Sequence, residues 1–398
     1  MFQNHFEWDS GEKLPMSRAL DKYWNYGLIK EKRCLENFPE YNGLDRTLDF
    51  EARLDKLHTL YNVYCPTGQA YEVFSQLYST VREAYRIKES GDNFPKVLSF
   101  SLIGESGSGK TTMIKRILNL CPQVIYHKIS DREFHQVVYL YVETPHDGSI
   151  KGLCLSIINQ IDSVLGTNLY NSAMVQRGSV DSLIIVMMEA FKTHNVGLLV
   201  VDEIQNLCSG KSSTGIKMLK FLLQFVNAHN IAIALVGTPL IRDYFMTEDW
   251  MARRTYGEIL QPFEEGQEFD KLLDTLWRYQ YTQHPAICTA RIRSMLYAFS
   301  QGMPYRLINL LYNVQKQAIL DGTEIISESA IKQVAGELGY VNKSFSYKAL
   351  PKRRGVNMQT HEAQYDSEDI RALSAKFTQK SKGLFDELVK RKVVVDLI

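Results

Sequence analysis

The chain has 398 residues, of which 45% are apolar and 23% charged, enough for a sizeable core in two or three domains. The formal net charge of +1 argues against a protein that coats DNA through overall positive charge, although a local basic stripe stays compatible with it. The six cysteines are scattered without a C-x-x-C pair, so neither a disulfide framework nor a zinc site is expected.

Targeting signals are not evident in the sequence. The first ten residues, MFQNHFEWDS, have neither the basic nor the apolar region of a secretion signal. No uninterrupted apolar run approaches the roughly 18–20 residues of a membrane span. We therefore expect a cytoplasmic protein that does not enter a membrane.

Residues 1–48 mix aromatic and charged side chains without sustained periodicity. They are interpreted either as an arm that docks a partner or as a strand-and-helix decoration packed on the main domain. From residue 49 to 89, apolar residues at spacings of three and four predict helices. In nucleotide-binding domains such a segment often backs the base, which would place Tyr64 or Pro66 near it.

The stretch LSFSLIGESGSGKTT, residues 98–112, predicts a buried strand that runs into the phosphate-binding pattern G-x-x-x-x-G-K-[ST]. Its glycines let backbone N–H groups curl around a polyphosphate, and the next helix adds its dipole. Lys110 can reach the β and γ phosphates, and the Thr111 hydroxyl can hold Mg²⁺. A ligand-free turn is the alternative, but the strand before and the helix after favour a nucleotide site. The other loop residues expected at the nucleotide are Gly104, Ser106, Gly107, Ser108, Gly109 and Thr112.

The next part of the chain alternates between strand and helix patterns. A charged connection at 127–136 leads to a strand at 137–145, and apolar spacing then predicts a helix over 149–167 with one buried face. A polar, turn-like tract and a further helix follow. Lys151 lies in the first turn of the helix at 149–167, where the helix dipole disfavours a cation. It is interpreted as a surface lysine or as a nucleic-acid contact.

The second chemical motif is GLLVVDEIQN, residues 197–206. A short, wholly apolar segment bounded by glycine and acids is typical of a central parallel strand, whose carboxyl end faces the ligand in open α/β sheets. Asp202 then lies near the nucleotide and can hold the water shell of Mg²⁺. The adjacent Glu203 can polarise the attacking water.

The alternation repeats once more, with a helix at 216–230 and a strand at 231–237 that ends at Thr238. A polar residue there would lie between the two earlier motifs, where it could sense the γ-phosphate. Arg253 and Arg254 precede a fifth strand expected near 258–263. Either arginine could reach the nucleotide of a neighbouring subunit as an arginine finger, and solvated surface arginines are the alternative.

From residue 264 to about 340, four helical patterns follow one another with no strand between them, which predicts a separate helical domain. Arg306 would open the third of these helices and could contact the nucleotide from the same subunit, or lie at the surface. The tail beyond residue 341 contains a basic linker, KALPKRRG, and an amphipathic pattern near its end. It is interpreted as a partner-docking element.

Several signatures together resemble AAA+ ATPases of the TnsC/TniB type, which regulate target choice in bacterial cut-and-paste transposons, including CRISPR-associated ones. They are GSIKGLCLSIINQIDSVLGT, GLLVVDEIQNL, IALVGTP, MARRTYGE, LWRYQYTQ and SQGMPYRLINLLYNVQKQAI. The match spans residues 94–334, about three-fifths of the chain.

The resemblance implies an α/β fold of the AAA+ P-loop class: a parallel five-stranded sheet with helices on both faces, followed by a small all-α lid. The implied division is an N-terminal segment over 1–48, the nucleotide-binding domain over 49–262, the lid over 263–341 and the tail over 342–398. The implied cofactors are ATP and Mg²⁺, and the activity is a slow, switch-like ATPase.

The resemblance also assigns roles to individual residues. MgATP is bound by Lys110, Thr111 and Asp202, and Glu203 is the catalytic base. Thr238 is the first sensor, where asparagine is commoner, Arg253 or Arg254 is the finger, and Arg306 is the second sensor. The implied contacts to DNA backbone phosphates are Lys151, Arg177 and Ser179, without sequence readout.

The implied function is a regulator that assembles as a ring or filament on duplex DNA, links a target selector to the transposase, and disassembles on ATP hydrolysis. One alternative is an initiator or helicase-loader type of ATPase with no transposase partner. Another is a nucleotide-gated scaffold that does not touch DNA. An initiator is expected to carry a winged-helix DNA reader, and none is recognisable beyond residue 340, which favours the first hypothesis.

Overall fold

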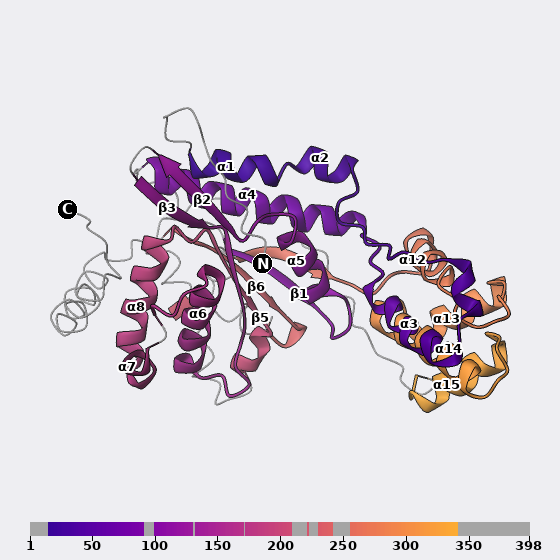
Figure 1. Ribbon diagram of the computed structural model, residues 1–398. Helices are drawn as coiled ribbons and strands as arrows, with labels where there is room; N and C mark the ends of the chain where they lie inside the picture. Colours follow the sequence, from indigo (N-terminus) through magenta and orange to yellow (C-terminus); the bar gives the residue numbers. More distant parts are fainter. Residues whose placement is uncertain are drawn as a thin grey trace, which may run out of the picture.

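The computed structural model describes residues 15–90, 99–129, 132–170, 172–208, 221–222, 230–241 and 255–340. It contains a five-stranded parallel sheet with helices on both faces and a helical domain beside it (Figure 1). The predicted fold class is confirmed. The strands are β1 (Ser99–Gly104), β2 (Val124–Ile129), β3 (Arg132–Val137), β4 (Tyr139–Glu143), β5 (Leu198–Asp202), β6 (Ala232–Gly237) and β7 (Thr255–Leu260).

The helices fall into three groups by position. Those against the sheet are α1 (Met16–Tyr23), α2 (Tyr26–Glu31), α4 (Gly68–Ser90), α5 (Lys110–Leu118), α6 (Ile150–Leu165), α7 (Ala173–Arg177) and α8 (Val180–Thr193). Those of the helical domain are α12 (Gln267–Trp277), α13 (Ala290–Ser300), α14 (Pro304–Leu320) and α15 (Glu328–Glu337). The remaining helical segments are α3 (Phe50–Lys56) and the 3-10 turns at Gly43–Thr47, Leu57–Asn62, Ile204–Cys208 and Pro239–Ile241.

The sheet has the strand order β4-β5-β6-β1-β7. Side chains alternate between its two faces, as the two-residue period of a strand requires. In β5, Leu198 and Val200 pack with α4 and α5, while Leu199 and Val201 pack with α6 and α8. Every residue of this strand is buried, because helices cover both faces.

The charged segment at 127–136, predicted as a connection, is instead part of an antiparallel hairpin. Strands β2 and β3 pair from Val124–Val137 to Ile129–Arg132. The prediction failed because half of the hairpin side chains are polar. His127 and Gln136 are both buried and hydrogen-bond each other at 2.8 Å, so polar residues here satisfy one another inside the fold.

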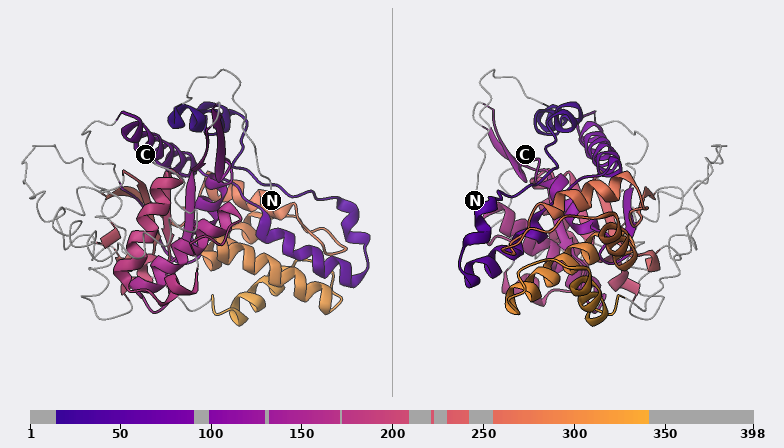
Figure 2. Two further views of the ribbon diagram at one scale, coloured as in Figure 1. Left: turned by 60° about the vertical axis from the view of Figure 1, so that its left-hand side comes forward. Right: turned by 90° about the vertical axis from the view of Figure 1, so that its right-hand side faces the viewer.

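The N-terminal residues divide between the two domains. Figures 1 and 2 show α1 and α2 lying along α4, and Trp24 is fully buried against Phe74 of α4. Residues 39–63, which we call the strap, leave this face and pack on the helical domain instead. Asn37 and Tyr64, on either side of the strap, form a β-bridge, so the strap leaves and returns at one place.

The strap straddles residue 49, where the sequence placed the start of the nucleotide-binding domain. Leu57 and Leu60 of the strap are fully buried in the same apolar cluster as α12 and α14. The helices predicted after residue 48 therefore do form, but the first of them completes the core of the helical domain.

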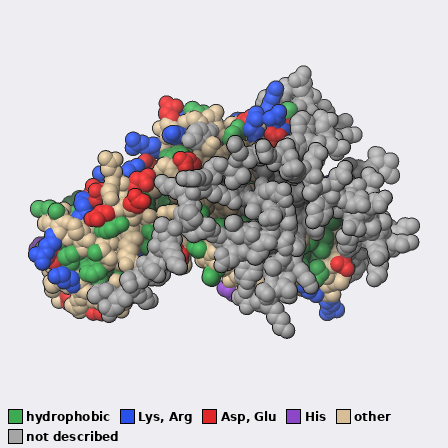
Figure 3. Space-filling model, turned by 180° about the vertical axis from the view of Figure 1, so that it is seen from behind, with side chains coloured by type: hydrophobic (Ala, Val, Ile, Leu, Met, Phe, Trp, Pro, Cys, Tyr) green, Lys and Arg blue, Asp and Glu red, His purple; other side chains and the backbone are tan. Residues whose placement is uncertain are grey.

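The helical domain contains the four predicted helices, α12 to α15. It joins the sheet domain through the segment after β7, where the Phe263 N–H donates to the carbonyl of Gly302 at 2.9 Å. A side chain at Gly302 would place its Cβ 1.9 Å from the Phe263 carbonyl oxygen, so only glycine fits this junction. Acidic and basic side chains are interspersed over the face of this domain in Figure 3.

Some expectations lie outside the described residues. They are the helix at 216–230 apart from its residues 221–222 and 230, both candidate finger arginines, the first fourteen residues and the tail beyond residue 340. Among the described helices, none is both long and apolar enough to cross a membrane.

Candidate functional site

The phosphate loop connects β1 directly to α5, as the sequence predicted. Gly107 and Gly109 have φ values of 84° and 93°, in the left-handed region that favours glycine. Gly109 is also the residue before the first turn of α5, so the loop delivers its backbone N–H groups to the N-terminus of a helix. Anions are favoured at such a terminus because N–H groups and the helix dipole point toward them.

Lys110 is the first residue of α5 and is 8% exposed. Its ammonium group donates to the Glu105 carbonyl at 2.9 Å, within the same loop. Burial lowers the pKa of Lys110, and the carboxylates of Asp202 and Glu203 oppose that shift. The loop thus holds a buried cation at the place where phosphates would be bound.

Asp202, at the end of β5, is 1% exposed, and its carboxylate receives three hydrogen bonds. The Thr111 hydroxyl donates at 2.7 Å and the Tyr141 hydroxyl at 2.6 Å, both to Oδ2. The Glu203 backbone N–H donates to Oδ1 at 2.7 Å. The two residues predicted to bind Mg²⁺, Thr111 and Asp202, are therefore in direct contact.

Tyr141 of β4 is a site residue that the sequence analysis missed. Its hydrogen bond to Asp202, together with burial, raises the pKa of its hydroxyl, with burial as the larger cause. The Lys115 ammonium also lies over the Tyr141 ring, 4.7 Å from the ring centroid. The alternation of side chains along β4 could have indicated that Tyr141 lies at the site. Tyr139 and Tyr141 are on one face of this strand and Leu140 and Val142 on the other, and β4 pairs with β5.

Thr238 follows β6, which lies between β1 and β5 in the sheet. The predicted placement of this residue between the phosphate loop and the acid pair agrees with that strand order. Its Oγ1 is buried and has no hydrogen-bond partner among the described residues, and the same is true of Ser108 Oγ in the phosphate loop. Buried hydroxyls without partners are rare in folded proteins, so two of them at one site indicate that a polar ligand belongs there.

Glu203 has a φ of 53°, in the left-handed region that non-glycine residues rarely adopt. Its carbonyl accepts from the Asn206 N–H at 2.9 Å, and its side chain is exposed. Strained backbone of this kind clusters at functional sites. The conformation turns the chain sharply after the buried Asp202, which leaves the Glu203 carboxylate at the surface of the cavity described next.

A cavity of about 880 Å³ lies over the phosphate loop. Its walls come from the loop, Glu203, the strap end, the segment after β7 and the start of α14. Of the two residues suggested to lie near the base, Tyr64 lines the cavity and Pro66 does not. The predicted site residues that line it are Ser106, Gly107, Ser108, Gly109, Lys110, Thr111, Thr112, Glu203 and Thr238. Gly104 lies behind the loop, where a Cβ would meet the Leu260 carbonyl at 2.7 Å.

Arg306 is in α14 but is not among the residues that line the cavity. Its guanidinium donates to Gln301 Oε1 at 3.2 Å and lies 5.2 Å from the ring centroid of Tyr340. The neighbouring Tyr305 instead touches the phosphate loop, since its N–H donates to the Gly107 carbonyl at 3.2 Å. The start of α14 is therefore at the site, while the predicted sensor side chain has other partners.

The three residues predicted to contact DNA lie on elements that pack against one face of the sheet. Lys151 is in the first turn of α6 and is half-buried. Arg177 ends α7 and is exposed. Ser179 caps α8 by accepting a hydrogen bond from the Ser182 N–H at 3.3 Å. Helices α6 and α8 pack against each other in one apolar cluster.

The sequence of residues 98–245 matches the family model described as an AAA domain. This range runs from the phosphate-loop strand through the acid pair to Thr238. These residues form an AAA+ ATPase domain. No curated protein matches the chain.

The solved structures that are similar to the chain include the following three. Orc1 from Aeropyrum pernix, solved in complex with DNA, has a TM-score of 0.48 and 14% identity, covering 71% of this chain and 69% of its own. Cdc6p from Pyrobaculum aerophilum has a TM-score of 0.45 and 18% identity, covering 70% of each chain. A Walker-type ATPase from Pyrococcus abyssi has a TM-score of 0.42 and 15% identity, covering 65% and 71%.

The residues present suit a nucleotide with a divalent metal ion. The loop supplies N–H donors and a buried ammonium, and Ser108 and Thr238 each supply a hydroxyl that has no partner in the part of the chain that the structure describes. Asp202 and Thr111 supply the hard oxygen ligands that Mg²⁺ prefers. The AAA+ domain therefore has the groups needed to bind a nucleoside triphosphate and its metal ion.

Proposed function

We propose that the chain binds ATP with Mg²⁺ and hydrolyses it to ADP and phosphate as a slow switch. The observation that carries this proposal is the convergence of Lys110, Thr111, Asp202 and Thr238 at one edge of the sheet, from three neighbouring strands. Lys110 binds the phosphates and Thr111 with Asp202 holds the metal ion, whose charge stabilises the phosphate oxygens. Glu203 accepts the proton of the attacking water.

The arginine finger is proposed to act on the nucleotide of a neighbouring subunit. Arg253 and Arg254 lie outside the described residues, but β7 begins at the next residue, Thr255, which pairs with Ser99. The phosphate loop begins at the opposite end of β1. A strand of six residues spans about 20 Å, which favours action across a subunit interface over action within one subunit. Arg306 is proposed as the sensor from the same subunit.

DNA binding is proposed at the face that carries Lys151, Arg177 and Ser179. Lys151 has no ion pair or hydrogen bond through its side chain within the described part of the chain, although the first turn of a helix disfavours a cation. A phosphate of duplex DNA would compensate that charge. Contacts of this type bind the backbone and carry no sequence preference.

The biological role is proposed to be the regulation of transposition. The chain would assemble as a ring or filament on duplex DNA, link a target-selection protein to the transposase, and release both when ATP is hydrolysed. The sequence signatures of the TnsC/TniB type support this role. The segments outside those signatures, at the two ends of the chain, are the proposed docking sites for the partners.

The decisive experiment images the purified chain with a non-hydrolysable ATP analogue and duplex DNA of random sequence. Rings or filaments threaded by DNA are expected, and assembly should require the nucleotide. Nucleotide-bound monomers that ignore DNA would contradict the proposal. An assembly that recruits a helicase or origin DNA but no transposase would instead favour the initiator or loader class.

Lys151→Ala tests the DNA face directly. The variant should weaken binding equally for all sequences and reduce the salt dependence of the affinity by about one phosphate contact. Lys332→Ala removes an exposed lysine from α15 and is the matched control. A salt slope that stays at the wild-type value in Lys151→Ala would remove this residue from the interface.

A further inference from the structure

The side chain of Gln205 connects two parts of the candidate site. It lies in the 3-10 turn Ile204–Cys208, which follows β5. Its Oε1 accepts a hydrogen bond from the Thr238 backbone N–H at 3.1 Å. Its Nε2 donates a short hydrogen bond to Oε2 of Glu203. One amide therefore bridges the end of β6 and the carboxylate beside the metal-binding aspartate.

The orientation of this amide is fixed by its two partners. The backbone N–H of Thr238 can only donate, and a carboxylate can only accept. A flipped amide would bring two donors together on one side and two acceptors on the other. Gly237 leaves the necessary room, because a Cβ there would lie 2.9 Å from Gln205 Oε1.

The backbone of Glu203 is held separately from its side chain. Its N–H donates to Asp202 Oδ1 and its carbonyl accepts from Asn206, which together keep the left-handed conformation. These bonds set the direction in which the side chain leaves the backbone. The remaining freedom lies in the side-chain torsions, and within the described residues Gln205 is the side chain that donates to this carboxylate.

We propose that Gln205 is a positioning residue for Glu203. It holds one carboxylate oxygen and leaves the other oriented to accept the proton of water. It also couples the carboxylate to the end of β6, so that a displacement of Thr238 changes the position of the base. This inference rests on the proposed function, in which Glu203 is the base for ATP hydrolysis.

The test compares Gln205→Met with Gln205→Glu. Methionine has a similar length but makes neither hydrogen bond, so kcat should fall about 10–100-fold, the usual cost of removing a residue that orients a catalytic group. The affinity for a fluorescent ATP analogue should stay within about threefold, because Gln205 is not proposed to bind the nucleotide. Gln333→Met, an exposed glutamine of α15, is the matched control.

Gln205→Glu supplies a readout that a purely structural role would not change. Its carboxylate can still accept from Thr238, but it faces the Glu203 carboxylate as a like charge. Like charges at hydrogen-bond distance raise the pKa of the pair, so the acidic limb of the pH profile of kcat should move to higher pH. Adding Gln205→Met to a Glu203→Gln background should cause little further loss, since both act on one step.

The outcomes separate this inference from the function on which it rests. Wild-type kcat in Gln205→Met together with an unmoved pH limb in Gln205→Glu would overturn the positioning role while ATP hydrolysis stands. Wild-type turnover in Glu203→Gln would overturn the base assignment itself, and the positioning role with it. Thermal melting of each variant shows whether a loss of activity reflects unfolding.

Discussion

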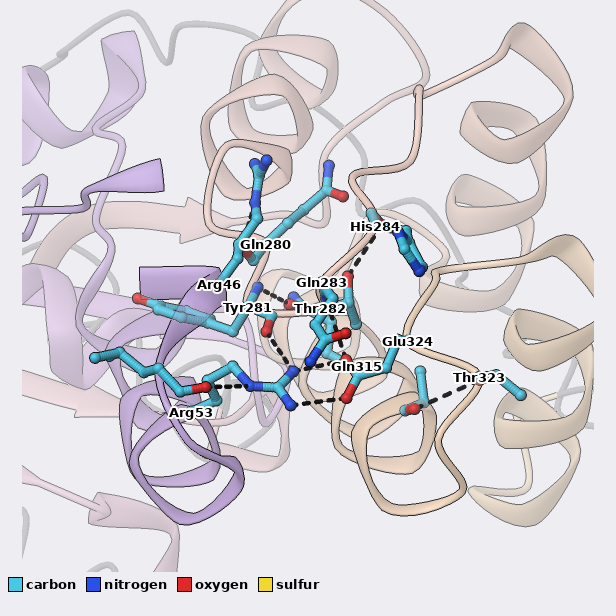
Figure 4. Close-up of polar contacts among 12 residues, drawn as sticks. Arg46, Arg53, Gln280, Tyr281, Thr282, Gln283, His284, Gln315, Thr323 and Glu324 are labelled. Atoms are coloured by element: carbon cyan, nitrogen blue, oxygen red, sulfur yellow. Dashed lines mark hydrogen bonds and ion pairs between the residues drawn. The ribbon is translucent and has the colours of Figure 1, made fainter. Parts of the chain in front are cut away.

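Asp202 and Arg53 are both buried charges, 1% and 2% exposed, but the structure treats them differently. Arg53 of the strap forms a two-pronged ion pair with Glu324 of the helical domain, at 2.6 and 2.7 Å, and also donates to backbone carbonyls (Figure 4). Asp202 receives hydrogen bonds from neutral groups, and no cation forms an ion pair with it among the described residues. Within the described residues, an ion-pair partner neutralises the charge of Arg53, and no such partner is present for Asp202.

The difference separates a structural charge from a functional one. A buried ion is costly unless a partner compensates it. The Glu324 carboxylate compensates the charge of Arg53, so this pair holds the strap on the helical domain and does not require a ligand. Asp202 is oriented by its donors and forms no ion pair with a cation among the described residues, which suits a site that binds a metal ion.

The two charges are connected through the cavity. The strap that Arg53 holds in place ends at residue 63, and the cavity wall includes Tyr61, Val63 and Tyr64. The Tyr61 hydroxyl also donates to Asn309 of α14. The structural ion pair therefore fixes one wall of the cavity that Thr111, the hydrogen-bond partner of Asp202, also lines.

The largest expected effect comes from Arg53→Met, which leaves the largely covered Glu324 carboxylate without its partner. Removing one member of a buried ion pair costs about 3–5 kcal/mol, and denaturant unfolding should show this loss. Arg53→Met/Glu324→Gln should recover a large part of it. A single variant as stable as wild type would show that the pair does not hold the strap.

Acid unfolding provides an independent measurement of how much the Arg53–Glu324 pair stabilises the fold. The hydrogen bonds from Arg53 lower the pKa of Glu324 below its ordinary value of 4.5. A carboxylate with a lowered pKa stabilises the fold above the ordinary pKa, and this contribution is lost as the pH falls through the lowered value. The double variant should lack that part of the acid unfolding curve. An unchanged curve in the double variant would contradict the assignment.

Most of the sheet domain could be predicted from sequence because its signals are local. A phosphate loop is a contiguous pattern, and an apolar strand that ends in Asp202 is a second one. Parallel pairing then brings the strand ends to one edge, so the contact between Thr111 and Asp202 follows from the topology. The placement of Thr238 needed only the order of the strands.

The strap and the bridging side chains could not be predicted in this way because they depend on distant partners. Nothing local to Arg53 indicates Glu324, 271 residues away in the chain. The Tyr141 and Gln205 contacts depend on which strands become neighbours. The β2–β3 hairpin was missed because its buried polar pair looks like a loop until the two strands are placed together.

The next effect is expected in the candidate site, where a buried charged residue, Lys110, is again replaced by methionine. Lys110→Met removes a buried cation whose pKa burial lowers in spite of the nearby carboxylates of Asp202 and Glu203, so those carboxylates compensate its charge only in part. The free energy of unfolding without nucleotide should therefore stay near the wild-type value or rise. The ATP affinity should fall at least about 100-fold, which corresponds to about 2.7 kcal/mol.

Isothermal titration with ATP and Mg²⁺ measures the affinity of Lys110→Met, and Lys316→Met, an exposed lysine of α14, serves as its control. The contrast with Arg53 would fail if Lys110→Met unfolded as readily as Arg53→Met. It would also fail if the variant bound ATP as tightly as wild type.

The smallest effect on stability is expected for Thr238→Val, which removes a buried hydroxyl that has no hydrogen-bond partner within the described ranges. Valine has nearly the same shape, and a buried polar group without a hydrogen bond costs about 1–3 kcal/mol. The variant should therefore be as stable as wild type, or more stable by up to about 1 kcal/mol, yet hydrolyse ATP more slowly.

Thr80→Val is the matched control, because the Thr80 hydroxyl donates to the Gln76 carbonyl at 2.8 Å. The control should lose about 0.5–1.5 kcal/mol and keep its activity. If Thr238→Val lost as much stability as Thr80→Val, its hydroxyl would belong to the fold rather than to the ligand.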